Sequence, residues 1–376
     1  HFRLAWIVPG CLGWAGERIG MQVVKDIRRA WAHLRSGKGS HAYLPFWRQS
    51  MEMGALFLLR GIGPGYYLQA RWWRPSVLFA DKWAHVNKKE YNAFIDRWNR
   101  PGYQKSSQHK VIEKAILQLV GVPTPEFIGY LHPQRGACAD GVALRGAADL
   151  ELLCRKLMGK KVCLKPVEGY GGAGFSAFEI GEAGDMPVFR HPVTGEETSI
   201  ADWWRLAAQN REGYIVEHFL HQHPVLSSIH PNSVNTLRIW LYQARGECRI
   251  AGAFLRVGRK GSMVDNTSQG GIFCPVELET GILTHAANAK NPLETMDVHP
   301  DTGGRISGVQ LPHWRACQEV AMQALRAFPH VNIAGVDVAI AVDGPRMIEL
   351  NVRPDQIGCA RLNLPLKQVD QWMRAA

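Results

Sequence analysis

The chain has 376 residues, of which 46% are hydrophobic and 20% are charged, and its formal net charge is +11. This length allows two to three domains with a large buried core, and the composition is that of a soluble globular protein. The eight cysteines are scattered without a CxxC pair. That pattern excludes a disulfide framework and predicts reduced thiols in a cytoplasmic protein.

The first 105 residues predict a mostly helical region. Residues 1–16 are apolar, but they are too few and too interrupted by Pro and Gly to span a bilayer, so no transmembrane segment is expected. The chain does not begin with Met, which leaves open a removed signal or anchor. Apolar residues at helical spacing predict an amphipathic basic helix and three further helices, over Glu17–Arg35, Phe46–Arg60, Gly65–Trp73 and Lys89–Asn99.

Positive charge is concentrated in this helical region. Residues 1–110 hold 18 Lys and Arg against 6 Asp and Glu, and eight of the 13 tryptophans, whereas the other 266 residues carry a net charge of −1. A basic, Trp-rich surface fits an anionic partner such as acidic lipid or a polyanionic glycan. The alternative is a solvated basic face whose tryptophans pack on a neighbouring domain. No DNA- or RNA-binding motif is visible, so specific nucleic-acid binding is not expected.

The segment Lys161–Ile180, KVCLKPVEGYGGAGFSAFEI, predicts a β-hairpin whose turn is a glycine loop. Such a loop lets backbone N–H groups approach a phosphate, and Lys165 before it adds a positive charge. No helix pattern follows the loop, which disfavours a dinucleotide-binding fingerprint, and Walker and protein-kinase loops place their lysine elsewhere. A nucleotide-covering hairpin and a tight turn in a β-rich domain both stay open. The loop glycines are Gly169, Gly171, Gly172 and Gly174.

A second pair of strands is predicted near the end of the chain. The strands are Gly335–Val342 and Arg346–Asn351, joined by a turn at Asp343 and Gly344. The pattern of strand residues on both sides of a two-residue turn indicates an antiparallel hairpin.

This hairpin carries three polar side chains among apolar neighbours. Glu349 and Asn351 are two residues apart and share a face, and Asp337 meets them from the other strand. Carboxylate and amide oxygens suit Mg²⁺, and the absence of Cys and His from the set disfavours zinc. The alternative is a solvent-facing acidic pair, but burying charges inside such strands costs several kcal/mol unless they are paired or bind metal.

These motifs together resemble the ATP-grasp superfamily. The order is a lysine-and-glycine hairpin, a strand ending in a Glu-led hinge, YIVEHFL, and a strand pair ending in ELNVRP. Two further stretches, 223–241 (HPVLSSIHPNSVNTLRIWL) and 264–283 (VDNTSQGGIFCPVELETGIL), are similar to the sugar-transfer-associated ATP-grasp family, relatives of the α-L-glutamate ligases. The resemblance covers roughly residues 106–358.

The resemblance implies an α+β, ATP-grasp fold in which two subdomains grip ATP. We expect a helical N-terminal region over 1–105, a subdomain with the glycine-rich lid over 106–220, and a subdomain with the Mg²⁺-binding strands over 221–376. Helices are predicted at Ser106–Val120, with serine caps and an end at Gly121, and at Ala147–Met158 beneath the lid.

For the nucleotide, the resemblance implies Lys165 with the four loop glycines, and a further lysine near the Ser106–Val120 helix. Lys110 is the better match and Lys82 its rival. The adenine edge is expected at the hinge, at Glu217, His218, Phe219 and Leu220. Where the family has an acidic residue for the ribose, this chain has Gln222 and His223. His223 is either a ribose contact or a structural histidine before Pro224.

Further residues are expected to bind phosphate or substrate. Arg238 faces away from the core residues of its strand, toward the cleft, and its guanidinium fork matches a γ-phosphate. Asn235 enters the same strand, and the resemblance implies catalytic roles for Lys165, Arg238, Arg353 and Asn235. Arg256 on the next strand and Arg353 beyond Asn351 add positive charge. Weaker candidates for metal or substrate contact are Asp265 and Asn266.

The activity implied is that of an ATP-dependent carboxylate–amine ligase. It would use ATP and Mg²⁺, as two ions, or Mn²⁺, to form an acyl-phosphate that an amine converts to an amide. Its partners would be ATP and small-molecule or peptide carboxylates and amines. One alternative is a kinase of the same fold that phosphorylates a hydroxyl. Another is a non-catalytic nucleotide-binding assembly protein of polysaccharide biosynthesis.

Overall fold

The computed structural model describes residues 25, 26, 28 and 32, and the ranges 43–169, 174–265 and 270–375. Its contacts divide the chain into two compact units. The first unit takes the described residues up to Tyr91 together with Gln356–Val369, and the second takes Asn92–Asp355 with Asp370–Ala376. The predicted boundary after residue 105 therefore differs from the boundary in the structure, which falls within a helix.

The first unit is helical. Its core contains the buried rings of Tyr67, Trp72 and Trp73, and α2 ends at Gly61, whose φ of 65° is the left-handed conformation that glycine adopts readily. The helices are α2 (Phe46–Arg60), α3 (Pro64–Gln69), α4 (Phe79–Trp83) and α12 (Gln356–Arg361), and two helices extend into the second unit, α5 (Lys88–Trp98) and α13 (Leu366–Ala375).

The predicted helix over Phe46–Arg60 is confirmed, and that over Lys89–Asn99 is found one residue earlier, as α5. The predicted Gly65–Trp73 helix is too long: α3 ends at Gln69, and Trp72 and Trp73 lie in a turn where both rings are buried. Of the predicted basic helix near the start of the chain, only residues 25, 26, 28 and 32 are described.

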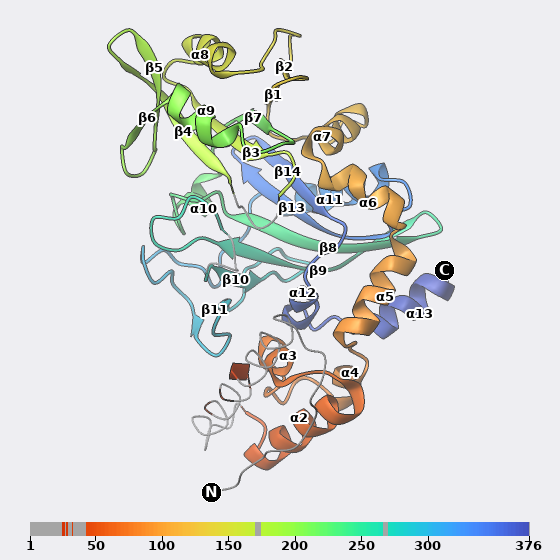
Figure 1. Ribbon diagram of the computed structural model, residues 1–376. Helices are drawn as coiled ribbons and strands as arrows, with labels where there is room; N and C mark the ends of the chain where they lie inside the picture. The colour runs from red at the N-terminus through yellow and green to blue at the C-terminus, as the bar shows by residue number, and fades with distance from the viewer. Residues whose placement is uncertain are drawn as a thin grey trace, which may run out of the picture. The chain divides into compact units, whose positions relative to one another are not determined.

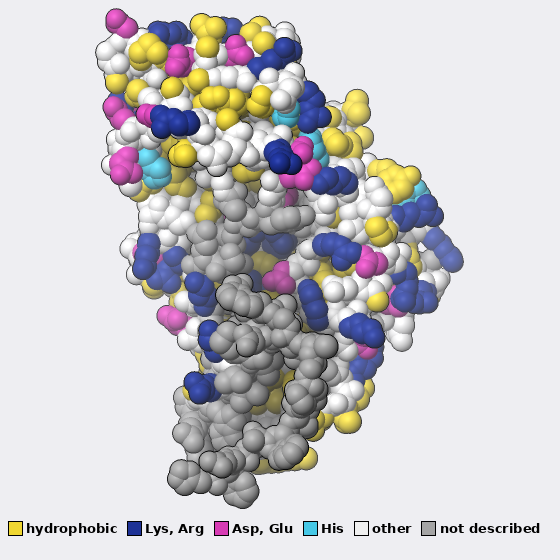
Figure 2. Space-filling view, in the orientation of Figure 1, with side chains coloured by type: hydrophobic (Ala, Val, Ile, Leu, Met, Phe, Trp, Pro, Cys, Tyr) yellow, Lys and Arg dark blue, Asp and Glu magenta, His cyan; other side chains and the backbone are white. Residues whose placement is uncertain are grey.

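The second unit contains two seven-stranded antiparallel sheets (Figure 1). The first has the order β2-β1-β7-β3-β4-β5-β6, and α8 and α9 pack on its strands around Phe189 and Ile200. Its elements are β1 (Phe127–Leu131), β2 (Ala137–Cys138), α8 (Ala147–Lys156), β3 (Lys161–Pro166), β4 (Ser176–Ala183), β5 (Met186–Arg190), β6 (Glu197–Ser199), α9 (Ile200–Ala207) and β7 (Tyr214–His218). On the face drawn in Figure 2, acidic and basic side chains are interspersed over this sheet and its helices.

The second sheet has the order β12-β11-β10-β9-β8-β13-β14. Its elements are β8 (Thr236–Ala244), β9 (Glu247–Val257), β10 (Ile272–Pro275), β11 (Ala286–Asn288), β12 (Thr295–Met296), β13 (Ile333–Ala341) and β14 (Gly344–Asn351). The short α10 (Pro224–Ser227) precedes it, and α11 (Trp314–Ala327) packs against β8, β9, β13 and β14.

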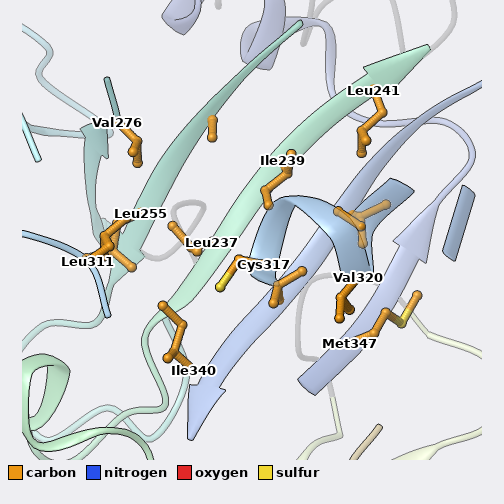
Figure 3. Packing of buried hydrophobic residues seen from close by; sticks show 14 of the residues in the cluster. Leu237, Ile239, Leu241, Leu255, Val276, Leu311, Cys317, Val320, Ile340 and Met347 are labelled. Carbon is orange, nitrogen blue, oxygen red and sulfur yellow. The ribbon is translucent and has the colours of Figure 1, made fainter. Parts of the chain in front are cut away.

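The core of this sheet lies between its strands and α11 (Figure 3). Leu237, Ile239 and Ile340 point from the strands toward Cys317 and Val320 of the helix, and all five side chains are buried. Burying apolar surface is worth about 25 cal/mol per Å², so this cluster stabilises the sheet. Alternation along β8 directs Arg238 to the opposite face, as predicted.

Two predicted hairpins are confirmed. β3 pairs with β4 and β13 pairs with β14, both antiparallel. The β13–β14 turn lies one residue earlier than predicted, at Val342 and Asp343, because Gly344 already pairs with Ala341.

The predicted Ser106–Val120 helix is wrong as a single element. It consists of α6 (Pro101–Gln108) and α7 (Lys110–Leu119), separated by His109 in an extended conformation with ψ 104°. No side-chain cap is present there, so the predicted serine caps are wrong as well. The Ala147–Met158 helix is found as α8, which ends two residues earlier.

Two further expectations from composition bear on the fold. Within the described residues, no helix combines the length and the apolar character needed to cross a membrane.

Cys154, Cys163 and Cys317 are buried thiols, and burial raises the pKa of each to about 12. Their low reactivity fits a packing role.

Candidate functional site

A buried charge cluster joins the first sheet to α7. Glu217 on β7 is 3% exposed, and its two carboxylate oxygens face Lys114 Nζ at 2.5 Å and Lys165 Nζ at 2.6 Å. Lys114 Nζ also donates to Pro125 O at 2.5 Å and to Thr124 Oγ1 at 3.1 Å. Burial alone would raise the pKa of Glu217, but the two lysines outweigh it and lower that pKa.

The same helix contacts the second sheet. Glu113 on α7 is buried, and its Oε1 accepts the backbone N–H of Leu350 on β14 at 2.7 Å. That amide lies between Glu349 and Asn351 in the sequence. Burial, and then the charge of Glu349, raise the pKa of Glu113 well above its ordinary value.

A small cavity lies where α7, β3, β7 and β14 meet. Its lining includes both lysines of the Glu217 cluster and Glu113, and it also includes Lys110 at the start of α7 and Met347 on β14. Lys110 lines this cavity, whereas Lys114 is the helix lysine that contacts Glu217. Lys82, the rival, lies in the first unit, fully buried against Glu52 and the carbonyl of Trp72.

A second charge cluster lies on the second sheet. Asp337 on β13 is paired in register with Arg238 on β8 and with Glu349 on β14. Both Asp337 oxygens accept hydrogen bonds from Arg238, and Oδ2 also accepts one from Arg256 at 2.9 Å. Burial would raise the pKa of Asp337, but the two guanidinium groups hold it below its ordinary value.

Arg256 extends this cluster to Asp265. Its Nη2 donates to Thr236 Oγ1 at 2.6 Å, and its Nε lies 3.4 Å from Asp265 Oδ2. Asp265 accepts hydrogen bonds from the backbone and hydroxyl of Thr236, while burial raises its pKa. Arg256 and Asp265 thus lie in one network with Arg238 and Asp337.

The three residues predicted to bind Mg²⁺ are brought together by the β13–β14 register. Asp337 pairs with Glu349, and Gly335 pairs with Asn351. No described residue hydrogen-bonds the side chain of Glu349 or Asn351, and Asn351 Nδ2 is buried without a partner. The donor set fits a hard divalent cation, because the side-chain oxygens of Glu349 and Asn351 accept no hydrogen bond from a described residue and Asp337 Oδ1 keeps a second lone pair.

The hinge after β7 offers fewer backbone groups to adenine than expected. The amide of His218 donates to Glu126 O at 3.0 Å, and that of Phe219 donates to Lys161 O at 2.9 Å, so both are used inside the sheet. Leu220 follows, and its amide has no hydrogen-bond partner among the described residues. The side chain of Glu217 is directed to the two lysines.

Three residues near α10 have structural roles, which for Asn235 differs from the predicted role. Asn235 is fully buried, and its Nδ2 donates to Gln222, Leu226 and His230 while its Oδ1 accepts from Ser233, which leaves no polar atom for a substrate. The Gln222 amide nitrogen donates to two backbone carbonyls. His223 Nδ1 accepts the amide of Val225 and caps α10, which favours the structural alternative for this histidine.

Arg353 lies away from the arginine pair. Its Nε donates to Gln104 Oε1 at 2.8 Å, and its guanidinium pairs with Asp96 on α5. Both partners belong to helices before the first sheet. The predicted contact of Arg353 with a substrate carboxylate or the transferred phosphoryl group therefore has no support in this arrangement.

The glycine loop is described only at its two ends. Gly174 has φ 75°, and a Cβ there would lie 2.7 Å from Pro166 Cγ, so this position requires glycine on both grounds. Gly169 is half-buried just after β3. Gly171, Gly172 and Asn266 lie outside the described residues.

Sequence reasoning missed Glu113 and Lys114. Both lie on α7, where they are buried beside the apolar residue Leu117. A charged pair beside apolar residues on one helix face was the available signal, because such charges are buried only when they have partners.

Two antiparallel sheets, with a lysine and glycine hairpin on one and a carboxylate-bearing hairpin on the other, define an α+β protein of the ATP-grasp class. Residues 90–363 match the model of the sugar-transfer associated ATP-grasp family, and the chain belongs to that family. No curated protein sequence matches the chain.

Several solved structures are similar to parts of this chain. The L-amino acid ligase from Bacillus licheniformis is 15% identical with a TM-score of 0.39, and the match covers 70% of this chain and 48% of that one. D-alanyl-alanine synthetase A from Vibrio cholerae is 12% identical with a TM-score of 0.40, covering 71% and 60%. A D-cycloserine synthetase is 14% identical with a TM-score of 0.41, covering 81% and 93%. This chain spans about half to three fifths of the length of the first two structures.

Proposed function

We propose that the protein is an ATP-dependent carboxylate–amine ligase. A substrate carboxylate oxygen attacks the γ-phosphorus of ATP, and the bond from that phosphorus to the ADP oxygen breaks. An amine then attacks the carbonyl carbon of the acyl-phosphate, phosphate leaves, and the amine proton passes to solvent. Family membership and the two facing charge clusters support this proposal.

In this proposal Lys165 binds the nucleotide phosphates, while Lys114, whose three N–H donors are used by Glu217, Pro125 and Thr124, holds Glu217 in position. Glu217 holds each ammonium group by one carboxylate oxygen, which leaves further N–H donors on Lys165 for phosphate oxygens. The open amide of Leu220 is available to the adenine edge. The hairpin that carries Gly174 covers the phosphates and excludes water, which would hydrolyse the acyl-phosphate.

Arg238 and Arg256 neutralise the charge that develops on the transferred phosphoryl group. Asp337 holds both guanidinium groups at fixed positions, so little reorganisation is needed during the reaction. Glu349, Asn351 and Asp337 would hold Mg²⁺, which, when bound, screens the phosphate charge and orients the γ-phosphate.

The observation that carries the proposal is the open pair Glu349 and Asn351 beside two paired arginines. The side chains of Glu349 and Asn351 are half-buried and make no hydrogen bond to a described residue; a structural salt-bridge network would satisfy such groups, whereas a binding site leaves them for a ligand. A kinase of this fold would need the same residues. The two reactions differ in the group that accepts the phosphoryl group, which is a carboxylate in the ligase and a hydroxyl in the kinase.

The test is ADP release from ATP with a panel of carboxylates crossed with amines, including amino acids, amino sugars and uronic acids. A ligase needs both an acid and an amine for multiple turnovers. ADP release with a hydroxyl compound alone, and no amine, would identify the kinase.

Glu349→Gln should lower kcat/KM at least about 100-fold, the loss typical of removing one electrostatic stabiliser. The matched control is Glu279→Gln, an exposed glutamate in the same unit, which should retain wild-type turnover. Wild-type turnover in Glu349→Gln would refute the assigned role.

A further inference from the structure

Three segments of the second unit meet at a group of ligand-type side chains outside the proposed ATP site. His109 lies between α6 and α7, Glu168 follows β3, and Glu212 precedes β7. Backbone hydrogen bonds hold the segments together: Lys110 N donates to Val167 O at 3.1 Å, and Val167 N donates to Gly213 O at 3.0 Å.

One ring nitrogen of His109 and one carboxylate oxygen from each glutamate lie within 4.8 Å of one another. His109 Nδ1 is buried and has no hydrogen-bond partner among the described residues. A buried ring nitrogen without a partner is costly in a folded protein unless a ligand satisfies it. His109 is also the residue whose extended conformation separates α6 from α7.

We propose that His109, Glu168 and Glu212 form a binding site for a divalent transition-metal ion of the Zn²⁺ type. An imidazole nitrogen with two carboxylates is a donor set that Zn²⁺ takes readily, with water completing the coordination. Mg²⁺ prefers an all-oxygen set. The site shares no residue with the proposed Mg²⁺ site, and it stands whether or not the chain is a ligase.

The neighbouring charges are compatible with an ion. Lys105 Nζ lies 2.5 Å from Glu168 Oε2, and Arg135 Nη2 lies 3.9 Å from Glu212 Oε2. Each glutamate has a second oxygen to offer. Because Lys105 competes with a cation for Glu168, its removal should strengthen metal binding.

An ion at this site would lie next to elements that carry proposed nucleotide-binding residues. His109 immediately precedes α7, which carries Lys110 and Lys114, and Glu168 immediately precedes the glycine loop. A bound ion would therefore fix the start of that loop relative to α7 and β7.

The test is a titration of the metal-free full chain with ZnCl₂, followed by competition with a chromophoric zinc chelator. We expect one tight equivalent. His109→Ala and Glu212→Gln should each weaken Zn²⁺ binding at least about 10-fold. Mutating residues that only hydrogen-bond to metal ligands already lowers metal affinity by that factor, so losing a ligand should cost no less. Lys105→Met should tighten it, a direction that general damage to the fold does not produce.

Two controls fix the assignment. His285→Ala removes an exposed histidine that lies 2.8 Å from one carboxylate, Asp297, and Glu349→Gln alters the proposed Mg²⁺ site; both should bind Zn²⁺ like the wild type. Melting curves of the metal-free variants check folding, and the Nδ1 atom that His109→Ala removes has no hydrogen-bond partner among the described residues. Absence of a stoichiometric site in the wild type, undiminished binding in His109→Ala, or weaker binding in Lys105→Met would overturn the proposal.

Discussion

Glu113 shows how one side chain connects parts of the site. Its carboxyl accepts the Leu350 amide beside Glu349, and it is buried within α7. Leaving that amide unpaired would cost about 1–3 kcal/mol, so the contact keeps β14 in position. The same burial makes the ionised form of Glu113 unfavourable.

We expect Glu113 to make stability depend on pH. Because its folded-state pKa lies above the ordinary value of 4.5, its stabilising contribution is complete below that pH and is lost as the pH rises through the folded pKa. Glu113→Gln keeps an acceptor for Leu350 and cannot ionise. The difference in unfolding free energy, wild type minus variant, should therefore fall from pH 4.5 toward neutrality, as measured by urea unfolding.

The control for this experiment is Glu182→Gln, which changes an exposed glutamate on β4. Its difference from the wild type should stay level over the same pH range. A level profile in Glu113→Gln would contradict the assigned environment.

The sequence predicted some of these residues and missed others for a physical reason. Asp337 and Glu349 are visible because polar residues inside apolar strands stand out, and strand alternation places them on a face. Lys114 and Glu113 are hidden, because helices commonly carry charges. Asn235 looked catalytic because a loop sequence does not reveal that its amide is used by Gln222.

At the scale of elements, β13 makes room for the arginine of β8. A Cβ on Gly335 would lie 2.9 Å from Arg238 Cδ and 3.1 Å from Pro354 Cβ. Glycine at position 335 therefore lets the Arg238 side chain pass close to the β13 backbone. In this position Arg238 reaches Asp337.

Gly335→Ala should displace Arg238, destabilise the protein by about 1–3 kcal/mol and lower activity. In an Arg238→Ala background the same change should cost less, because the main clash is gone. Urea unfolding of the two single variants and the double variant measures this. The control is Gly146→Ala, where a Cβ would meet nothing within 4 Å. If the losses of unfolding free energy in the two single variants simply add in the double variant, the clash between residue 335 and Arg238 is not the cause.

Element boundaries depend on contacts that the sequence does not display. The helical periodicity of residues 106–120 continues across His109, yet the structure ends α6 there, and the amide of Lys110 bonds to Val167 O. Distant residues thus decide where a helix begins.

At the scale of the whole molecule, binding of the nucleotide should stabilise the fold. MgATP at about 100 times its Kd should add about 2.7 kcal/mol to the free energy of unfolding, and so raise Tm. Lys165→Ala should reduce this shift, and Lys160→Ala, an exposed lysine just before β3, should keep it. Thermal unfolding monitored by fluorescence measures both. An undiminished shift in Lys165→Ala would remove Lys165 from the nucleotide site.

Strand order lies beyond reach of local sequence patterns. β1 pairs with β7 and β8 pairs with β13, across about 80 residues or more of intervening chain. Hairpins join strands that are close in the sequence, so they were predictable. The long-range pairings depend instead on how the whole sheet buries its apolar face, which no local pattern displays. The family resemblance supplied that part of the expectation.

Helix α7 is attached to the first sheet by Lys114 and to the second by Glu113. Both attachments are buried, so a hinge located at this helix would have to break an ion pair and a hydrogen bond at once. If substrates enter and products leave by movement of the chain, we expect the mobile part to be the β4–β6 edge of the first sheet, with α7 as the stationary pivot.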